Sequence, residues 1–181
     1  MTDKERSTVM EMIVAINTDF AVQDEVKVKT IRDTFIRDFT VDVTREPEYV
    51  LKLLEAAYLE KNSGDVEFSI TIAGSFNLIS KDYVSILMKL IETDWHYMHE
   101  DIASIFQTLK SSNTVDCLYR TALRRFKYLD YDDAYALAVK CIWALGDINT
   151  IASKTKLELL AQSDNQVIKD NAIYQLNRLA I

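Results

Sequence analysis

Residues 134–146 read AYALAVKCIWALG and show the clearest helical pattern of the chain. Its apolar residues form two adjacent rows with a spacing of four, namely Leu137, Cys141 and Leu145, and Ala138 and Ile142. Apolar residues at this spacing lie on one face of an α-helix. The stretch therefore predicts an amphipathic helix with a wide apolar stripe.

The last apolar pair of this helix has counterparts in four other segments. The five pairs, each spaced by four residues, are Phe35 and Phe39, Ile72 and Phe76, Ile105 and Leu109, Cys141 and Leu145, and Ala172 and Leu176. Successive pairs are 31 to 37 residues apart. A repeat of this length is typical of helix pairs stacked in a solenoid. We therefore predict an all-α protein, an α-solenoid of about five antiparallel helix pairs, in a single domain over residues 1–181.

Ten segments show the helical period. They cover approximately residues 5–17, 24–39, 47–61, 66–76, 82–91, 97–110, 113–126, 134–146, 149–161 and 165–179. The segment after Asp65 also alternates as a half-buried strand does, and the register of the repeat favours a helix there. We expect Gly64 to take the left-handed conformation that ends the preceding helix, and Asp65 to cap the next one.

The composition agrees with this fold class. The chain has three glycines and one proline in 181 residues, too few turn residues for an all-β protein. The sequence shows neither a signal peptide nor an apolar run long enough to span a membrane, so we expect a cytoplasmic protein without a membrane partner. Cys117 and Cys141 fall within helical patterns and are expected to be buried free thiols.

The formal net charge of the chain is −7. A negative protein is repelled by phosphate backbones and attracts basic proteins, so the charge disfavours nucleic acid and favours a basic protein partner. The one basic stretch is Arg120, Arg124, Arg125 and Lys127. We expect it to form an outer helix face that pairs with acidic neighbours. We expect Trp143 to lie in the core.

The C-terminal third resembles a known family. Residues 144–148, ALGDI, and Ile168 and Lys169 followed by Ala172 and Leu176, resemble the second helices of HEAT repeats. Residue 138 is Ala where that family's consensus has Arg. Small acidic HEAT-like proteins of bacteria include cytoplasmic immunity factors encoded beside secreted toxins, and the resemblance implies such a role here. HEAT-like DNA glycosylases are a second relative class.

Carboxylates and aromatic rings gather in the turns before second helices, which share one edge of a solenoid. We define the acidic-aromatic edge as Asp94, Trp95, Tyr97, Glu100, Asp101, Asp130, Tyr131, Asp132, Asp133 and Tyr135. One interpretation is that the aspartates only cap helices. The other is a partner-binding surface, because large rings in turns are unusual unless they are buried or lie at an interface.

No residue set for catalysis is apparent, and we expect no cofactor, no metal and no small-molecule substrate. The spacing of His96 and His99 permits chelation, but no signature of a metal protease accompanies it, so we expect packed or solvated histidines. The sequence hypothesis is a non-catalytic immunity protein that binds a basic toxin domain, a nuclease in the simplest case, through the acidic-aromatic edge. The alternatives are a HEAT-like adaptor and, less favoured by the charge, a DNA glycosylase.

Overall fold

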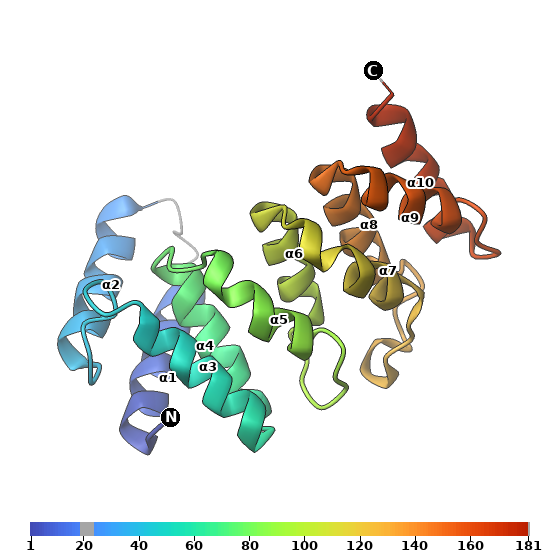
Figure 1. The fold of residues 1–181 in the computed structure, drawn as a ribbon. Helices are drawn as coiled ribbons and strands as arrows, with labels where there is room; N and C mark the ends of the chain where they lie inside the picture. The colour runs from blue at the N-terminus through green and yellow to red at the C-terminus, as the bar shows by residue number, and fades with distance from the viewer. Residues whose placement is uncertain (19–23, 181) are drawn as a thin grey trace. The chain divides into compact units, whose positions relative to one another are not determined.

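The computed structural model describes residues 1–18 and 24–180 (Figure 1). Within these residues the chain forms ten α-helices and three short 3₁₀ helices, with no strand. The predicted all-α class is confirmed. The chain divides into two compact units, Met1–Ile79 and Ser80–Ile181. The expectation that they fold as one domain stays a prediction.

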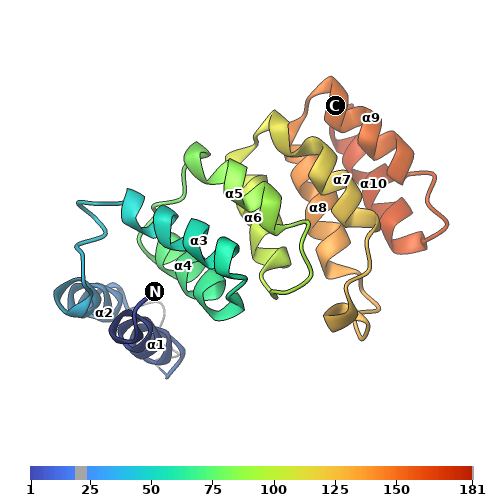
Figure 2. The ribbon, with the colours of Figure 1, turned by 60° about the horizontal axis from the view of Figure 1, so that its bottom comes forward.

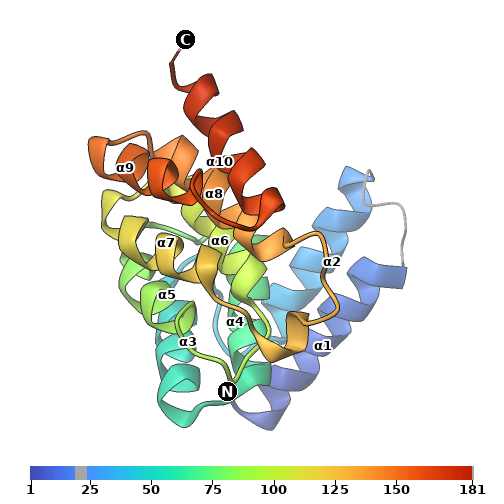
Figure 3. The ribbon, with the colours of Figure 1, turned by 90° about the vertical axis from the view of Figure 1, so that its right-hand side faces the viewer.

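The first unit contains four helices. They are α1 (Asp3–Thr18), α2 (Glu25–Asp38), α3 (Glu48–Glu60) and α4 (Ser63–Ser75). The helix α1 lies beside α2 and contacts α4, which packs against α3 (Figure 3). The core of the unit includes the fully buried side chains of Phe35, Leu54 and Ile72. The segment that also resembled a strand is therefore helical, as the repeat register predicted.

The predicted caps at the start of α4 are wrong. Asn62 is the N-cap and its side chain accepts a hydrogen bond from the amide of Asp65, while Lys61 takes the left-handed conformation with φ of 52°. Asp65 lies inside the helix and is buried. Its carboxylate accepts hydrogen bonds from the Arg6 guanidinium at 2.8 and 3.0 Å and from the Met1 amino group at 2.9 Å. A buried carboxylate needs such partners, and here they join α1 to α4.

The second unit contains the remaining elements. They are η1 (Lys81–Tyr83), α5 (Val84–Leu90), α6 (His99–Leu109), η2 (Ser112–Thr114), α7 (Val115–Leu123), η3 (Lys127–Leu129), α8 (Ala136–Ile148), α9 (Ile151–Leu160) and α10 (Gln166–Arg178). The helix α8, which the stretch 134–146 predicted, contacts α6, α7, α9 and α10 (Figure 2). All five residues of its apolar stripe are buried. The stretch from which the helical fold was predicted therefore forms the central helix of this unit.

Gly146 lets α10 approach α8 closely. A Cβ atom at this position would lie 2.2 Å from Oε1 of Gln175 and 2.9 Å from Nη2 of Arg178. Gln175 is buried, so its side chain has little room to give way. Next to the glycine, Asp147 accepts hydrogen bonds from Gln107 at 2.8 Å and Arg178 at 2.5 Å, which connect α8 to α6 and α10.

The predicted free thiols are confirmed, since Cys117 and Cys141 are both free and buried. Burial raises the pKa of Cys117 to about 11 and also raises the pKa of Cys141. A thiol with a raised pKa is protonated and weakly nucleophilic at neutral pH. In the described part of the chain, no helix has both the length and the apolar character of a membrane span.

Candidate functional site

The two halves of the acidic-aromatic edge meet at Tyr128. One half precedes and opens α6, and the other lies in the connection from α7 to α8, which contains η3 (Figure 2). The Tyr128 ring packs edge to face against Tyr97 with centroids 5.2 Å apart, and its hydroxyl lies 2.9 Å from Nδ1 of His99. Burial raises the pKa of Tyr128 to about 12, and the carboxylates of Glu100 and Asp101 act in the same direction. Tyr128 therefore attaches the connection to the start of α6.

His96 and His99 form the floor beneath this contact. Nε2 of His96 lies 2.9 Å from the carbonyl oxygen of Leu90, and its Nδ1 accepts the amide of Met98 at 3.1 Å. Nε2 of His99 lies 2.7 Å from the carbonyl oxygen of Thr93. All four ring nitrogens therefore have protein partners, and these are the packed histidines that the sequence favoured. Among the described residues, no group of three or more metal-ligating side chains is present.

Three carboxylates of the acidic-aromatic edge are used within the protein. Asp94 lies 3.9 Å from Arg124, and Glu100 forms an ion pair with Lys140 at 3.1 Å. Asp132 accepts the amides of Ala134 at 3.0 Å and Ala136 at 2.6 Å, so it caps the start of α8. For Asp132 the capping interpretation is therefore correct.

The other three carboxylates are open to solvent. Asp101, Asp130 and Asp133 are exposed, and within the described residues no basic side chain forms an ion pair with them. Asp101 lies in the first turn of α6, where a carboxylate complements the helix dipole, but no capping hydrogen bond to any of these three carboxylates is found among the described residues. They are the part of the predicted edge that is open to a partner.

The aromatic rings also fall into two groups. Tyr97 is 65% exposed and Tyr131 is 81% exposed, so both rings project into solvent. Trp95 is partly buried and packs edge to face on His96, with centroids 5.3 Å apart. Tyr135 is partly buried beneath the guanidinium of Arg125, which lies 4.5 Å from the ring centroid. Tyr97 and Tyr131 are therefore the rings placed to contact another molecule.

The predicted basic stretch pairs with acidic neighbours in part, but it does not lie on one helix. Arg120 forms an ion pair with Glu92, and Arg124 donates to the carbonyl oxygen of Glu92 at 2.5 Å. The helix α7 ends at Leu123, so Arg124 and Arg125 belong to the connection.

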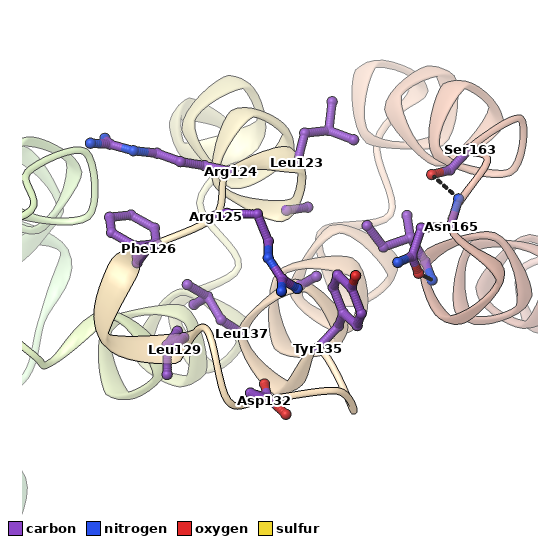
Figure 4. A pocket seen from close by; sticks show the side chains of 13 residues that line it. Leu123, Arg124, Arg125, Phe126, Leu129, Asp132, Tyr135, Leu137, Ser163 and Asn165 are labelled. Carbon is purple, nitrogen blue, oxygen red and sulfur yellow. Dashed lines mark hydrogen bonds between the residues drawn. The ribbon is translucent and has the colours of Figure 1, made fainter.

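Two hollows open on either side of the residues 124–126. The first encloses about 650 Å³ and is lined by Asp94, Tyr97, Arg124, Arg125, Phe126, Lys127 and Tyr128. The second encloses about 350 Å³ and is lined by side chains of α7, the connection, α8, the turn before α10 and α10 itself (Figure 4). Arg124 and Arg125 both line the second hollow, and in Figure 4 Arg124 extends away from Tyr135 whereas Arg125 extends toward it.

Several residues of this surface were not among the predicted site residues. Phe126 is buried, with its ring centroid 4.0 Å from that of His99, and Tyr128 carries the contacts given above. The periodic pattern placed Phe126 on the inner face of a longer helix, and no glycine or proline marks the real end of α7. Trp143, predicted as core, is only partly buried, and its Nε1 donates to Asn171 at 3.3 Å.

Comparison of the chain with protein-family models, with curated proteins and with solved structures gives no match. The functional assignment therefore depends on the chain's own residues.

Proposed function

We propose that this chain is a non-catalytic protein-binding protein, and that the acidic-aromatic edge is its binding surface. The observation that carries the proposal is the exposure of Tyr97 and Tyr131 beside the open carboxylates of Asp101, Asp130 and Asp133. Exposed aromatic rings are the side chains that most often anchor a protein interface. Carboxylates around them steer a basic partner and accelerate its association.

The scaffold that we propose for this surface is a HEAT-like solenoid of antiparallel helix pairs. In the second unit α7 contacts α8 and α9 contacts α10, as the members of helix pairs do. The helix α8 also contacts α6 and α10, and α7 contacts α9, so first helices lie beside first helices and second helices beside second helices. This neighbour pattern supports the HEAT resemblance of residues 131–181.

The role that we propose is cytoplasmic immunity to a toxin, in a bacterial toxin system. A toxin domain that cuts nucleic acid presents a basic surface, and an acidic protein that covers it replaces the phosphate charge. The net charge of −7 favours such a partner. On this account the chain binds no nucleic acid or small molecule itself and acts by occlusion.

The glycosylase alternative gains nothing from the structure. Lys140, the only cation on the predicted inner face of α8, pairs with Glu100 at 3.1 Å. A phosphate-binding surface needs several such cations.

A co-expression experiment tests the immunity role against the adaptor role. The C-terminal domain of a large secreted protein encoded directly upstream would be expressed in a bacterial host, with and without this chain. Immunity predicts that the domain stops growth and that the chain restores it. A domain that is harmless, or equally toxic in the presence of the chain, contradicts immunity and leaves the adaptor as the better assignment. The variant Tyr97→Ala combined with Tyr131→Ala is expected to lose protection, and Tyr174→Ala, an exposed ring on α10, serves as its control.

A further inference from the structure

The second hollow combines an apolar floor with a polar rim. Its floor includes the buried side chains of Phe126, Leu137 and Ile168. The more exposed residues Leu123, Arg124, Arg125, Asp132 and Tyr135 line its mostly polar rim. Its volume of about 350 Å³ lies within the range of roughly 300–1,000 Å³ that is usual for ligand pockets. The hollow shares Asp132 and Tyr135 with the acidic-aromatic edge, so the two surfaces are continuous.

Arg125 differs from the other arginines of the second unit. Among the described residues each of the others forms an ion pair, Arg120 with Glu92, Arg124 with Asp94 and Arg178 with Asp147, whereas Arg125 forms none. Asp132, the carboxylate that lines the hollow, accepts two backbone amides and forms no ion pair with Arg125. Arg125 therefore brings to the rim a positive charge that has no ion-pair partner among the described residues, and a carboxylate is its complementary group.

Tyr135 is held in an unfavourable backbone conformation at the same place. Its φ of 54° and ψ of 42° are left-handed, a conformation that is unfavourable for a bulky residue because Cβ lies close to the following carbonyl oxygen. The other described residues with positive φ are Lys61, Asn77, Lys110 and Asn149, and all follow the end of a helix. Tyr135 alone stands directly before the first residue of a helix. The two hydrogen bonds to Asp132 hold this turn, and the result is a ring fixed beneath Arg125 at the mouth of the hollow.

We infer that the hollow binds an acidic-apolar peptide segment of a protein partner. An aliphatic or aromatic side chain of the segment enters the hollow, and the carboxylate of a neighbouring Asp or Glu pairs with Arg125. The inference rests on the proposed function and deepens it, because the partner then offers basic residues to Asp130 and Asp133 and one acidic-apolar anchor beside them. Charges of opposite sign at adjacent positions fix the register of a complex.

Peptide titration of the isotope-labelled full chain, followed by NMR, tests the inference. The probes are the blocked tetrapeptides Gly-Glu-Leu-Gly, Gly-Lys-Leu-Gly and Gly-Glu-Ser-Gly. We expect only the first to cause saturable shifts of the amides of Leu123, Ala138 and Ile168, with a dissociation constant in the millimolar range. The Lys and Ser analogues should bind at least tenfold more weakly.

Substitutions in the hollow test which of its residues contact the peptide. Arg125→Gln should weaken binding of the Glu-Leu peptide at least fivefold, and Arg125→Lys should restore part of the loss. Arg120→Gln is the matched control and should leave binding unchanged, because Arg120 pairs with Glu92 and does not line the hollow. Leu123→Ser, a change at a half-exposed rim position, provides a second loss-of-binding variant if Arg125→Gln fails to fold.

Three results would overturn the inference. They are equal binding of the Lys-Leu peptide, full binding by Arg125→Gln, and binding of N-acetylleucine as tight as that of the peptide, which would indicate a site for small carboxylic acids instead. The double variant Asp130→Lys, Asp133→Lys separates this inference from the proposed function. It should slow the association of a basic partner at low salt and leave peptide binding intact, so failure of one proposal is visible without failure of the other.

Discussion

The imidazole rings of His96 and His99 stack on each other with centroids 4.3 Å apart and an interplanar angle of 14°. Both rings are buried, and their nitrogens are used by backbone groups and Tyr128. Two charged imidazoles at this distance repel each other, and burial penalises each charge. The floor of the candidate site therefore requires neutral histidines.

This arrangement makes the stability of the second unit sensitive to pH. Burial lowers the pKa of His99 to about 4, below the value of about 6.5 that it has in an unfolded chain, and lowers the pKa of His96 too. As the pH falls below 6.5 the unfolded state takes up protons that the folded state excludes, so stability is full above 6.5 and falls toward pH 4. We expect His99 alone to reduce the free energy of unfolding by about 2 kcal/mol between pH 7 and pH 5, measured by urea denaturation.

The variant His99→Gln is the control for this prediction. It should be less stable at pH 7 but should lose less stability on going to pH 5 than the parent chain. The carboxylates of Asp65 and Asp147 do not contribute to the change in stability between pH 7 and pH 5. Burial raises their pKa, but the hydrogen bonds and charges of their partners outweigh it and lower the pKa below 3.8, so their contribution is lost at lower pH. An unchanged slope in the variant would show that His99 is not the titrating group.

Adjacent aspartates of the connection should respond differently to removal. Asp132→Ala removes the acceptor of the amides of Ala134 and Ala136, and we expect it to lower the free energy of unfolding by about 1 kcal/mol. Asp133→Ala removes an exposed carboxylate and should change it by less than about 0.5 kcal/mol. Thermal unfolding of the two variants side by side checks the difference, and equal effects would contradict the capping role of Asp132.

Gly146 of α8 and Gly74 of α4 form another matched pair. Gly146→Ala places a methyl group 2.2 Å from Oε1 of buried Gln175, so we expect a loss of about 1–2 kcal/mol despite the better helix propensity of alanine. Gly74→Ala meets no atom within 4 Å in α4 and should gain about 0.5–1 kcal/mol. Denaturant titration measures both.

The same pair tests the expectation of a single domain, because Gly74 lies in the first unit and Gly146 in the second. A single cooperative domain predicts one transition that moves in opposite directions in the two variants. Two transitions, each moved by only one variant, would contradict it.

The helices could be predicted from the sequence because their apolar residues follow the helical period without interruption. The stripe of α8 and the ambiguous segment of α4 were both assigned by that period and its repeat. The end of α7 could not be predicted, since the apolar pattern continues to Phe126. Contacts distant in sequence hold Arg124 at Glu92 and Phe126 against His99, and they end the helix at Leu123.

The sequence predicted which residues make up the candidate site but not which of them are free to bind. The sequence predicted a cluster of carboxylates and rings, and the structure brings its two halves together through Tyr128. Which carboxylates are free depends on geometry. Asp132 and Asp133 are adjacent and chemically identical, yet only Asp132 accepts the first amide of α8, that of Ala136, and the amide of Ala134 before it. A test of the surface must therefore spare Asp132.

Tyr131 should act on the lifetime of the complex. Its ring is 81% exposed, so Tyr131→Ala should leave the stability of the protein unchanged. If the ring is an anchor in the interface, its loss should raise the dissociation rate of a basic partner at least tenfold with little effect on association. Surface-immobilised partner and stopped-flow kinetics separate the two rates, and a change confined to association would contradict an anchoring role.

The most direct test of the central claim is the association rate of a basic partner domain with the triple variant Asp101→Lys, Asp130→Lys, Asp133→Lys. The matched control, Glu55→Lys, Glu60→Lys, Glu67→Lys, changes the net charge equally at exposed positions of the first unit. At low salt we predict at least a tenfold slower association for the edge variant, a much smaller change for the control, and a difference that shrinks as salt is added. Equal association rates for the two variants would contradict the claim that the acidic-aromatic edge binds the partner.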